Sequence, residues 1–111
     1  MKKIIILSIL ILLCGCNKKL SNIDILKNMN EDEYVIIDVR TKEEYNEQHI
    51  VGAINIPYDE INQNEIINRD KAIFVYCKSG NRSEIALNEL SSLGYRVYDL
   101  GAFNNIDLPK E

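Results

Sequence analysis

The chain has 111 residues, of which 46% are hydrophobic and 27% charged, and its net charge is -4. This length and composition are typical of one small globular domain with a modest core. The acidic balance argues against a protein that binds the phosphate backbone of nucleic acids. The chain has no Trp and only 7% aromatic residues, which argues against a surface that stacks single-stranded bases. We therefore expect no nucleic-acid partner.

The N-terminal segment differs in character from the rest of the chain. Lys2 and Lys3 precede an apolar run, Ile4 to Leu13, in which Ser8 is the one polar residue. This run is too short to span a membrane, which takes about 20 residues, but it fits the apolar part of a secretory signal, about 7–15 residues. The alternatives are an uncleaved anchor or a buried helix, and a buried helix is disfavoured because the run lacks a polar face. We expect residues 1–15 to be an export signal.

The segment Leu13-Cys14-Gly15-Cys16 resembles the lipobox of bacterial lipoproteins. The resemblance implies that Cys16 receives fatty acyl chains such as palmitate and becomes the first residue of the mature protein. Cys14 departs from the pattern, in which Ala, Ser or Thr is more usual, and cleavage elsewhere would leave a secreted or signal-anchored protein. Two acyl chains hold a protein firmly on a membrane. We expect a lipid anchor on the extracytoplasmic face of a bacterial membrane, a tether at residues 16–20 and a domain at residues 21–108.

The first half of this domain has clear signals for helices and strands. A helix is expected to begin at Ser21, an N-cap with Asp24 three residues on. The apolar run from Tyr34 to Val39 predicts a strand that is buried on both faces. Thr41-Lys42-Glu43-Glu44 is a capping box, which predicts a helix to about Gln48. Gly52 to Pro57 predicts a brief strand that its proline ends.

The second half continues the alternation of helices and strands. Its expected elements are short helical pieces at Tyr58 to Asn68, a buried strand at Ile73 to Tyr76, a helix from Ser83 to Leu93 that Gly94 caps, a strand at Arg96 to Asp99 and a helical turn at Gly101 to Asn105. The helical side chains expected to face the core are Ile61, Ile66, Ile67, Ile85, Ala86, Leu90 and Leu93. This alternation predicts an α/β fold with a small parallel sheet.

The loop between the second buried strand and the following helix is the best candidate for chemistry. Once the two N-terminal cysteines are removed or lipidated, Cys77 is the one thiol of the mature domain, so no internal disulfide can form. Parallel sheets bind ligands beyond the carboxyl ends of their strands, where Cys77 lies. The N-terminus of the next helix, the positive φ that Gly80 permits, and the charges of Lys78 and Arg82 all favour a thiolate. The alternative is a buried and unreactive cysteine.

Several segments, in order and at fitting separations, resemble rhodanese-like domains. The two most specific are Cys77-Lys78-Ser79-Gly80-Asn81-Arg82-Ser83 and His49-Ile50-Val51-Gly52-Ala53-Ile54-Asn55-Ile56-Pro57. The others are Asp38-Val39-Arg40, Glu44-Tyr45, Ile73 to Tyr76, Leu90, Gly94 to Tyr98 and Leu100-Gly101. The resemblance covers about residues 20 to 108. Family members often have Gly-Gly and a later Trp where this chain has Gly101-Ala102 and Ile106, a departure that concerns packing more than chemistry.

The resemblance implies a five-stranded parallel sheet flanked by helices and the activity of a sulfurtransferase. We expect no cofactor and no metal, because no Cys/His cluster has the spacing of metal ligands and no Gly-rich nucleotide loop is present. Sulfane sulfur would pass from a small donor such as thiosulfate to Cys77, and from the resulting persulfide to a thiol, cyanide-like or protein acceptor. The backbone amides of the loop would cradle the persulfide; its residues are Lys78, Ser79, Gly80, Asn81, Arg82 and Ser83. Lys78 would attract the donor, and Arg82 would brace the loop with Asp38 as its partner.

Other interpretations of the same residues stay open. A Cys-dependent phosphatase or arsenate reductase needs five residues between its Cys and Arg, whereas four separate Cys77 from Arg82, a loop better suited to one sulfur. A rhodanese-like domain can also serve as a sulfur carrier or binding module without turnover, which the fold alone does not decide. His49 is expected to form structural hydrogen bonds rather than act as a general base, and Asp38 could instead pair with Arg40.

Overall fold

The computed structural model describes residues 20–63 and 68–111. The predictions of an export signal at residues 1–15 and of a lipidated Cys16 lie outside the described residues, as do those for Ile66 and Ile67. Within the described ranges, no helix is both long and apolar enough to cross a membrane.

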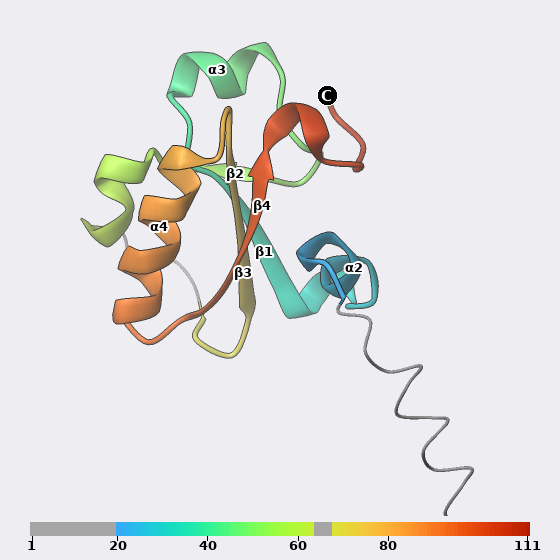
Figure 1. The fold of residues 1–111 in the computed structure, drawn as a ribbon, viewed down its shortest axis with the longest axis vertical. Helices are drawn as coiled ribbons and strands as arrows, with labels where there is room; N and C mark the ends of the chain where they lie inside the picture. Colours follow the sequence, from blue (N-terminus) through green and yellow to red (C-terminus); the bar gives the residue numbers. More distant parts are fainter. Residues whose placement is uncertain (1–19, 64–67) are drawn as a thin grey trace, which may run out of the picture.

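Within residues 20–63 and 68–111, the centre of the fold is a parallel sheet of four strands in the order β2-β1-β3-β4 (Figure 1). The strands are β1 (Tyr34–Asp38), β2 (Ile54–Asn55), β3 (Ala72–Cys77) and β4 (Arg96–Ala102). The predicted parallel α/β class is therefore confirmed. In place of the fifth strand that the resemblance implied, the described residues add an isolated antiparallel bridge between Ile50 and Lys110.

Two helices of the described residues, α2 (Asn22–Lys27) and α3 (Lys42–Glu47), begin where the sequence places their caps. The described residues also form α4 (Asn81–Ser92) and the 3-10 turns η1 (Glu31–Glu33), η2 (Tyr58–Gln63) and η3 (Phe103–Asn105). Capping boxes with both reciprocal hydrogen bonds close the starts of α2, at Ser21, and of α3, at Thr41. Helix α4 begins at Asn81, two residues earlier than predicted, because Gly80 is its N-cap.

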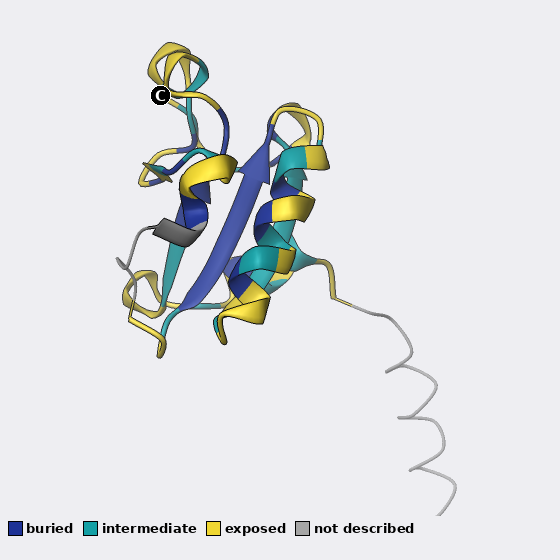
Figure 2. Ribbon diagram, turned by 90° about the vertical axis from the view of Figure 1, so that its left-hand side faces the viewer, coloured by how far each residue is buried: buried dark blue, intermediate teal, exposed yellow. Residues whose placement is uncertain are grey.

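Strand β3 divides the core into two apolar clusters. All six of its residues are buried, and it is the continuous dark blue strand in Figure 2. Successive side chains of a strand point to opposite faces. Ala72, Phe74 and Tyr76 therefore join the cluster that includes Leu26 of α2 and Phe103 of η3. The other three residues of β3, which end with Cys77, join the cluster beneath α4 and η2.

The buried side of α4 is narrower than the sequence predicts. Ala86 and Leu90 are buried as expected, but Ile85 is 50% exposed and Leu93 is 42% exposed, so these two predictions are wrong. Ile85 lies one position from Ala86, about 100° around the helix, and so points away from the sheet. Leu93 is the C-cap, beyond the last helical residue, where the helix no longer covers the core.

Candidate active site

Cys77 lies where the sheet, the loop and α4 meet. It is the last residue of β3, and its side chain is fully buried. The backbone N–H of Gly80 donates to Cys77 Sγ at 2.9 Å. Ser83 Oγ lies 3.5 Å from the same sulfur and donates to the Gly80 carbonyl at 3.1 Å. The first turn of α4 thus closes over the thiol and presents it with a backbone donor.

The loop over the thiol has the backbone conformation that its glycine allows. Gly80 has φ +102°, as the positive φ predicted for a tight cradle requires. A Cβ at this position would meet no atom within 4 Å, so the need for glycine is conformational rather than spatial. Lys78, Ser79 and Asn81 are exposed. These residues line the outer side of the loop, and Ser83 lies on its inner side.

Arg82 is held by Glu44 and not by Asp38, which corrects the predicted pairing. Arg82 Nη1 donates to Glu44 Oε1 at 2.8 Å, and Nη2 donates to Oε2 at 3.2 Å. The hydrogen bond from Arg82 is the main reason that the pKa of Glu44 falls from 4.5 to about 2. The pKa of Arg82 is raised, chiefly by Glu44 and to a smaller extent by Cys77. The ion pair therefore joins α3 to the Cys77 loop.

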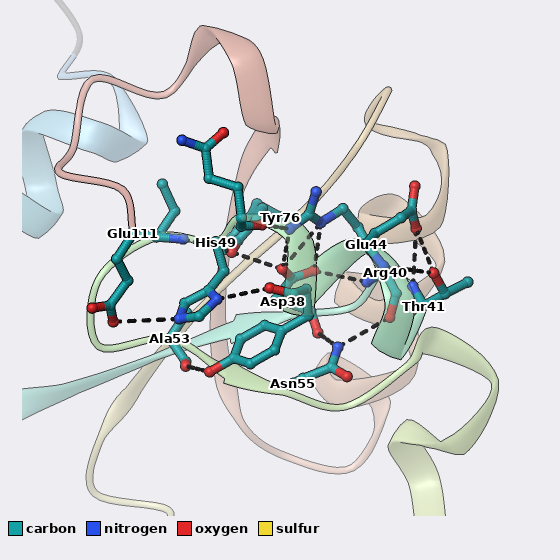
Figure 3. A network of polar contacts seen from close by, with 12 residues as sticks. Asp38, Arg40, Thr41, Glu44, His49, Ala53, Asn55, Tyr76 and Glu111 are labelled. Atoms are coloured by element: carbon teal, nitrogen blue, oxygen red, sulfur yellow. Dashed lines mark hydrogen bonds and ion pairs between the residues drawn. The ribbon is translucent and has the colours of Figure 1, made fainter.

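Asp38 is fully buried and pairs with Arg40, the other partner that the sequence left open. Arg40 Nη2 lies 2.7 Å from Asp38 Oδ2, and Arg40 Nε donates to Oδ1 at 2.9 Å. Arg40 Nη2 also donates to the Gln48 carbonyl at 2.6 Å, and the guanidinium covers the ring of Phe103. Figure 3 shows Asp38 at the centre of this network. Asp38 therefore supports the carboxyl end of β1, one strand away from Cys77.

Tyr76 connects the network to the residue before Cys77. Its hydroxyl donates to Asp38 Oδ2 at 2.8 Å and accepts from the backbone N–H of Ile50 at 3.0 Å. Burial is the main cause that raises the pKa of Tyr76, so the hydroxyl stays protonated and remains a donor. Asn55, at the end of β2, adds two hydrogen bonds to this network by donating to the backbone carbonyls of Asp38 and Arg40. These bonds fix the ends of β1 and β3 relative to each other.

His49 has the structural position expected for it. Its ring stacks on Tyr45 with centroids 3.8 Å apart, and Nδ1 lies 2.8 Å from the Tyr45 carbonyl oxygen. Its backbone exchanges two hydrogen bonds with Glu111, and its Nε2 lies 3.3 Å from the Glu111 carboxylate (Figure 3). Both ring nitrogens of His49 thus have a partner, Tyr45 of α3 on one side and Glu111 on the other.

Two residues of this region were not identified as site residues from the sequence. The sequence places Glu44 in a capping box and in a segment that resembles the family, but predicts no role for it in the site. An acidic residue at the start of the preceding helix is nevertheless a natural partner for the one arginine of the loop. Tyr76 was expected only as part of a buried strand. A tyrosine within an otherwise apolar run is itself a signal, because a buried hydroxyl requires a hydrogen-bond partner.

The chain is similar to proteins of known family and fold. The model of the rhodanese-like domain family matches residues 21–106. The thiosulfate sulfurtransferase PspE of Escherichia coli is 37% identical over 78 residues, which cover 67% of this chain and 75% of PspE. The putative sulfur carrier protein YrkF of Bacillus subtilis is 37% identical over 63% of this chain and 39% of YrkF.

A solved structure carries the same fold. The structure described as rhodanese with anions from E. coli superposes with a TM-score of 0.66 and 35% sequence identity, over 70% of this chain and 96% of that one. Together with the relatives named as a sulfurtransferase and a putative sulfur carrier, this similarity supports a role in sulfur transfer. The chain belongs to the rhodanese-like domain family.

Proposed function

We propose that this protein is a sulfurtransferase that moves sulfane sulfur from a small donor such as thiosulfate to a nucleophilic acceptor through a persulfide on Cys77. One observation carries the proposal: Cys77 Sγ lies at the carboxyl end of β3 and accepts a 2.9 Å hydrogen bond from the Gly80 N–H at the N-terminus of α4. The helix N-terminus and a backbone donor both favour an anionic sulfur.

The reaction would proceed in two half-reactions. In the first, the Cys77 thiolate attacks the outer sulfur of thiosulfate; the S–S bond of the donor breaks, and its electron pair leaves with sulfite. In the second, an acceptor such as cyanide or a thiolate attacks the terminal sulfur of Cys77–S–S⁻ and regenerates the thiolate. A covalent intermediate of this kind gives ping-pong kinetics. Lys78, exposed on the loop, would attract the anionic donor.

A sulfur carrier that needs a dedicated protein partner is the second candidate. Cys77 has no exposed surface, so access to its sulfur depends on the loop that covers it. The similarity to the putative sulfur carrier YrkF is in keeping with this alternative. A carrier would accept sulfur on Cys77 as readily as an enzyme, but it would transfer that sulfur slowly to small acceptors.

Mass spectrometry of the purified protein tests the proposal. Incubation with thiosulfate should add one sulfur atom, cyanide should remove it as thiocyanate, and Cys77→Ser should abolish the adduct. Ser79→Ala is the matched control and should keep the adduct, because it removes an exposed hydroxyl of the same loop and leaves the backbone amide in place. Failure to gain sulfur from both thiosulfate and a low-molecular-weight persulfide would refute sulfur transfer, while a stable adduct with slow release to cyanide would favour the carrier.

We also propose that Cys16 is lipidated and that the domain acts on the extracytoplasmic face of a bacterial membrane. The support is the order of a basic start, an apolar run and Leu13-Cys14-Gly15-Cys16. Cells grown with a labelled fatty acid should yield labelled protein, and Cys16→Ala should lose the label. Cys14→Ala is the control and should keep it. Equal labelling of the Cys16→Ala variant would rule out this anchor.

A further inference from the structure

The loop sequence supplies two cations, Lys78 and Arg82. The charge of Arg82 is compensated by its ion pair with Glu44. Arg82 Nη1 and Nη2 each donate to a different oxygen of the Glu44 carboxylate. This bidentate arrangement fixes the guanidinium in one orientation. The two side chains are equally accessible, each with 24% of its surface exposed. They therefore form a partly buried, neutral pair beside the loop rather than a cation directed into it.

Glu44 is itself held in place by the start of α3. Its Oε1 accepts from the Thr41 backbone N–H at 3.0 Å and from the Thr41 hydroxyl at 3.1 Å. These two hydrogen bonds orient the Glu44 carboxylate independently of Arg82. Arg82 directly precedes Ser83, whose Oγ lies 3.5 Å from Cys77 Sγ, so the guanidinium belongs to the same turn that covers the sulfur. The raised pKa of Arg82, caused chiefly by Glu44 and to a smaller extent by Cys77, agrees with this proximity. A change in the charge at Glu44 would consequently be felt by an anion bound over Cys77.

We propose that Glu44 determines donor specificity: by neutralising Arg82, it lowers the preference of the Cys77 loop for doubly charged sulfur donors relative to singly charged ones. The singly charged class comprises alkyl persulfides and alkyl thiosulfonates. With Arg82 neutralised, Lys78 is the cation of the loop that attracts the donor. This inference rests on the proposed sulfurtransferase function. Glu44 acts through Arg82 and is a positioning residue.

Two donors of the same chemistry but different charge allow a direct test. Thiosulfate carries two negative charges and releases sulfite, whereas methanethiosulfonate carries one and releases methanesulfinate. In both cases the thiolate of Cys77 attacks the terminal sulfur, the donor S–S bond breaks, and the electron pair leaves with the sulfur oxyanion. The ratio of kcat/KM for thiosulfate to kcat/KM for methanethiosulfonate, with cyanide as the acceptor, therefore reports charge selection by the site.

The variants follow from the geometry of the pair. Glu44→Gln keeps an oxygen that accepts from Thr41 and removes the charge, so the ratio should rise about threefold or more, through KM rather than kcat. Coulomb's law gives this magnitude for two unit charges that are about 6–8 Å apart in water. Arg82→Gln leaves the Glu44 charge uncompensated and should lower the ratio. The double variant should return close to the wild-type ratio, and added salt should compress all the differences.

Glu43→Gln is the matched control, since Glu43 is an exposed glutamate on the same helix, and it should leave the ratio unchanged. An equal fall in activity toward both donors, with unchanged ratios in Glu44→Gln and Arg82→Gln, would reduce Glu44 to a structural role and overturn the inference. If Glu44→Gln does not fold, the ratio of kcat/KM for the two donors is compared between wild type, Arg82→Gln and the double variant. Unchanged ratios in these two variants would overturn the inference. Addition of sulfur to wild-type Cys77, followed separately by mass, distinguishes this failure from failure of sulfur transfer itself.

Discussion

Replacement of Tyr76 by Phe isolates the contribution of the buried network, because it removes one oxygen and leaves the ring in place. That oxygen donates to Asp38 Oδ2 at 2.8 Å and accepts from the Ile50 N–H at 3.0 Å, and all three residues are at most 1% exposed. A hydrogen bond to a charged group contributes about 1.5–3 kcal/mol, and a buried N–H left without a partner costs about 1–3 kcal/mol. Asp38 keeps its bonds to Arg40, so we expect a loss of about 3 kcal/mol.

Urea unfolding followed by circular dichroism measures this loss. A decrease of about 3 kcal/mol is a large part of the 5–15 kcal/mol typical of a small domain and should lower Tm by more than about 10 °C. Tyr58→Phe is the control, because Tyr58 is 37% exposed, and it should change the stability by less than about 0.5 kcal/mol. A loss below about 1 kcal/mol for Tyr76→Phe, with an unchanged m-value, would mean that the network does not hold the strand ends.

Three further predictions concern the ion pair, the loop and α4. The pKa of Glu44 is about 2 in the folded protein, against an ordinary value of 4.5. Its carboxylate therefore stabilises the fold fully above about pH 4.5 and loses this effect as the pH falls toward 2. The difference in unfolding free energy between wild type and Glu44→Gln, measured by urea unfolding, should narrow between about pH 6 and about pH 2.5. Gly80→Ala should cost about 1–3 kcal/mol in the same assay, because alanine resists φ +102° although its Cβ has space. Leu90→Ala should cost about 2–5 kcal/mol and Ile85→Ala less than about 1 kcal/mol, and equal costs would contradict the observed exposure of Ile85.

The sequence predicts local structure well where the signal is contained in a few neighbouring residues. The N-cap at Ser21, the capping box at Thr41 and the positive φ of Gly80 are all confirmed, because each depends on the chemistry of a single turn. The position of Cys77 at a strand end, directly before a helix, is also confirmed and follows from the apolar run that precedes it.

Partners that come from different elements were harder to predict. Arg82 and Glu44 lie 38 residues apart, and the sequence does not reveal that α3 approaches the start of α4. The prediction that Asp38 holds Arg82 was wrong because Arg40, two residues along the chain, reaches Asp38 first and remains buried with it. The exposure of Leu93 likewise depends on where α4 ends, and the apolar periodicity places that end at Leu93 rather than at Ser92.

The alternation of side chains along β3 has a consequence for the tolerance of this domain to insertions and deletions. Cys77 shares its face with Ile73 and Val75, whereas Phe74 and Tyr76 occupy the opposite one. Loss or gain of a single residue within the strand would turn every following side chain to the other face. The thiol would then point toward Phe103, away from α4, and Tyr76 would be taken from Asp38. Insertions or deletions of one residue in β3 should therefore be far more damaging than most substitutions, because an odd change in the number of residues before Cys77 moves its sulfur to the other face of the sheet.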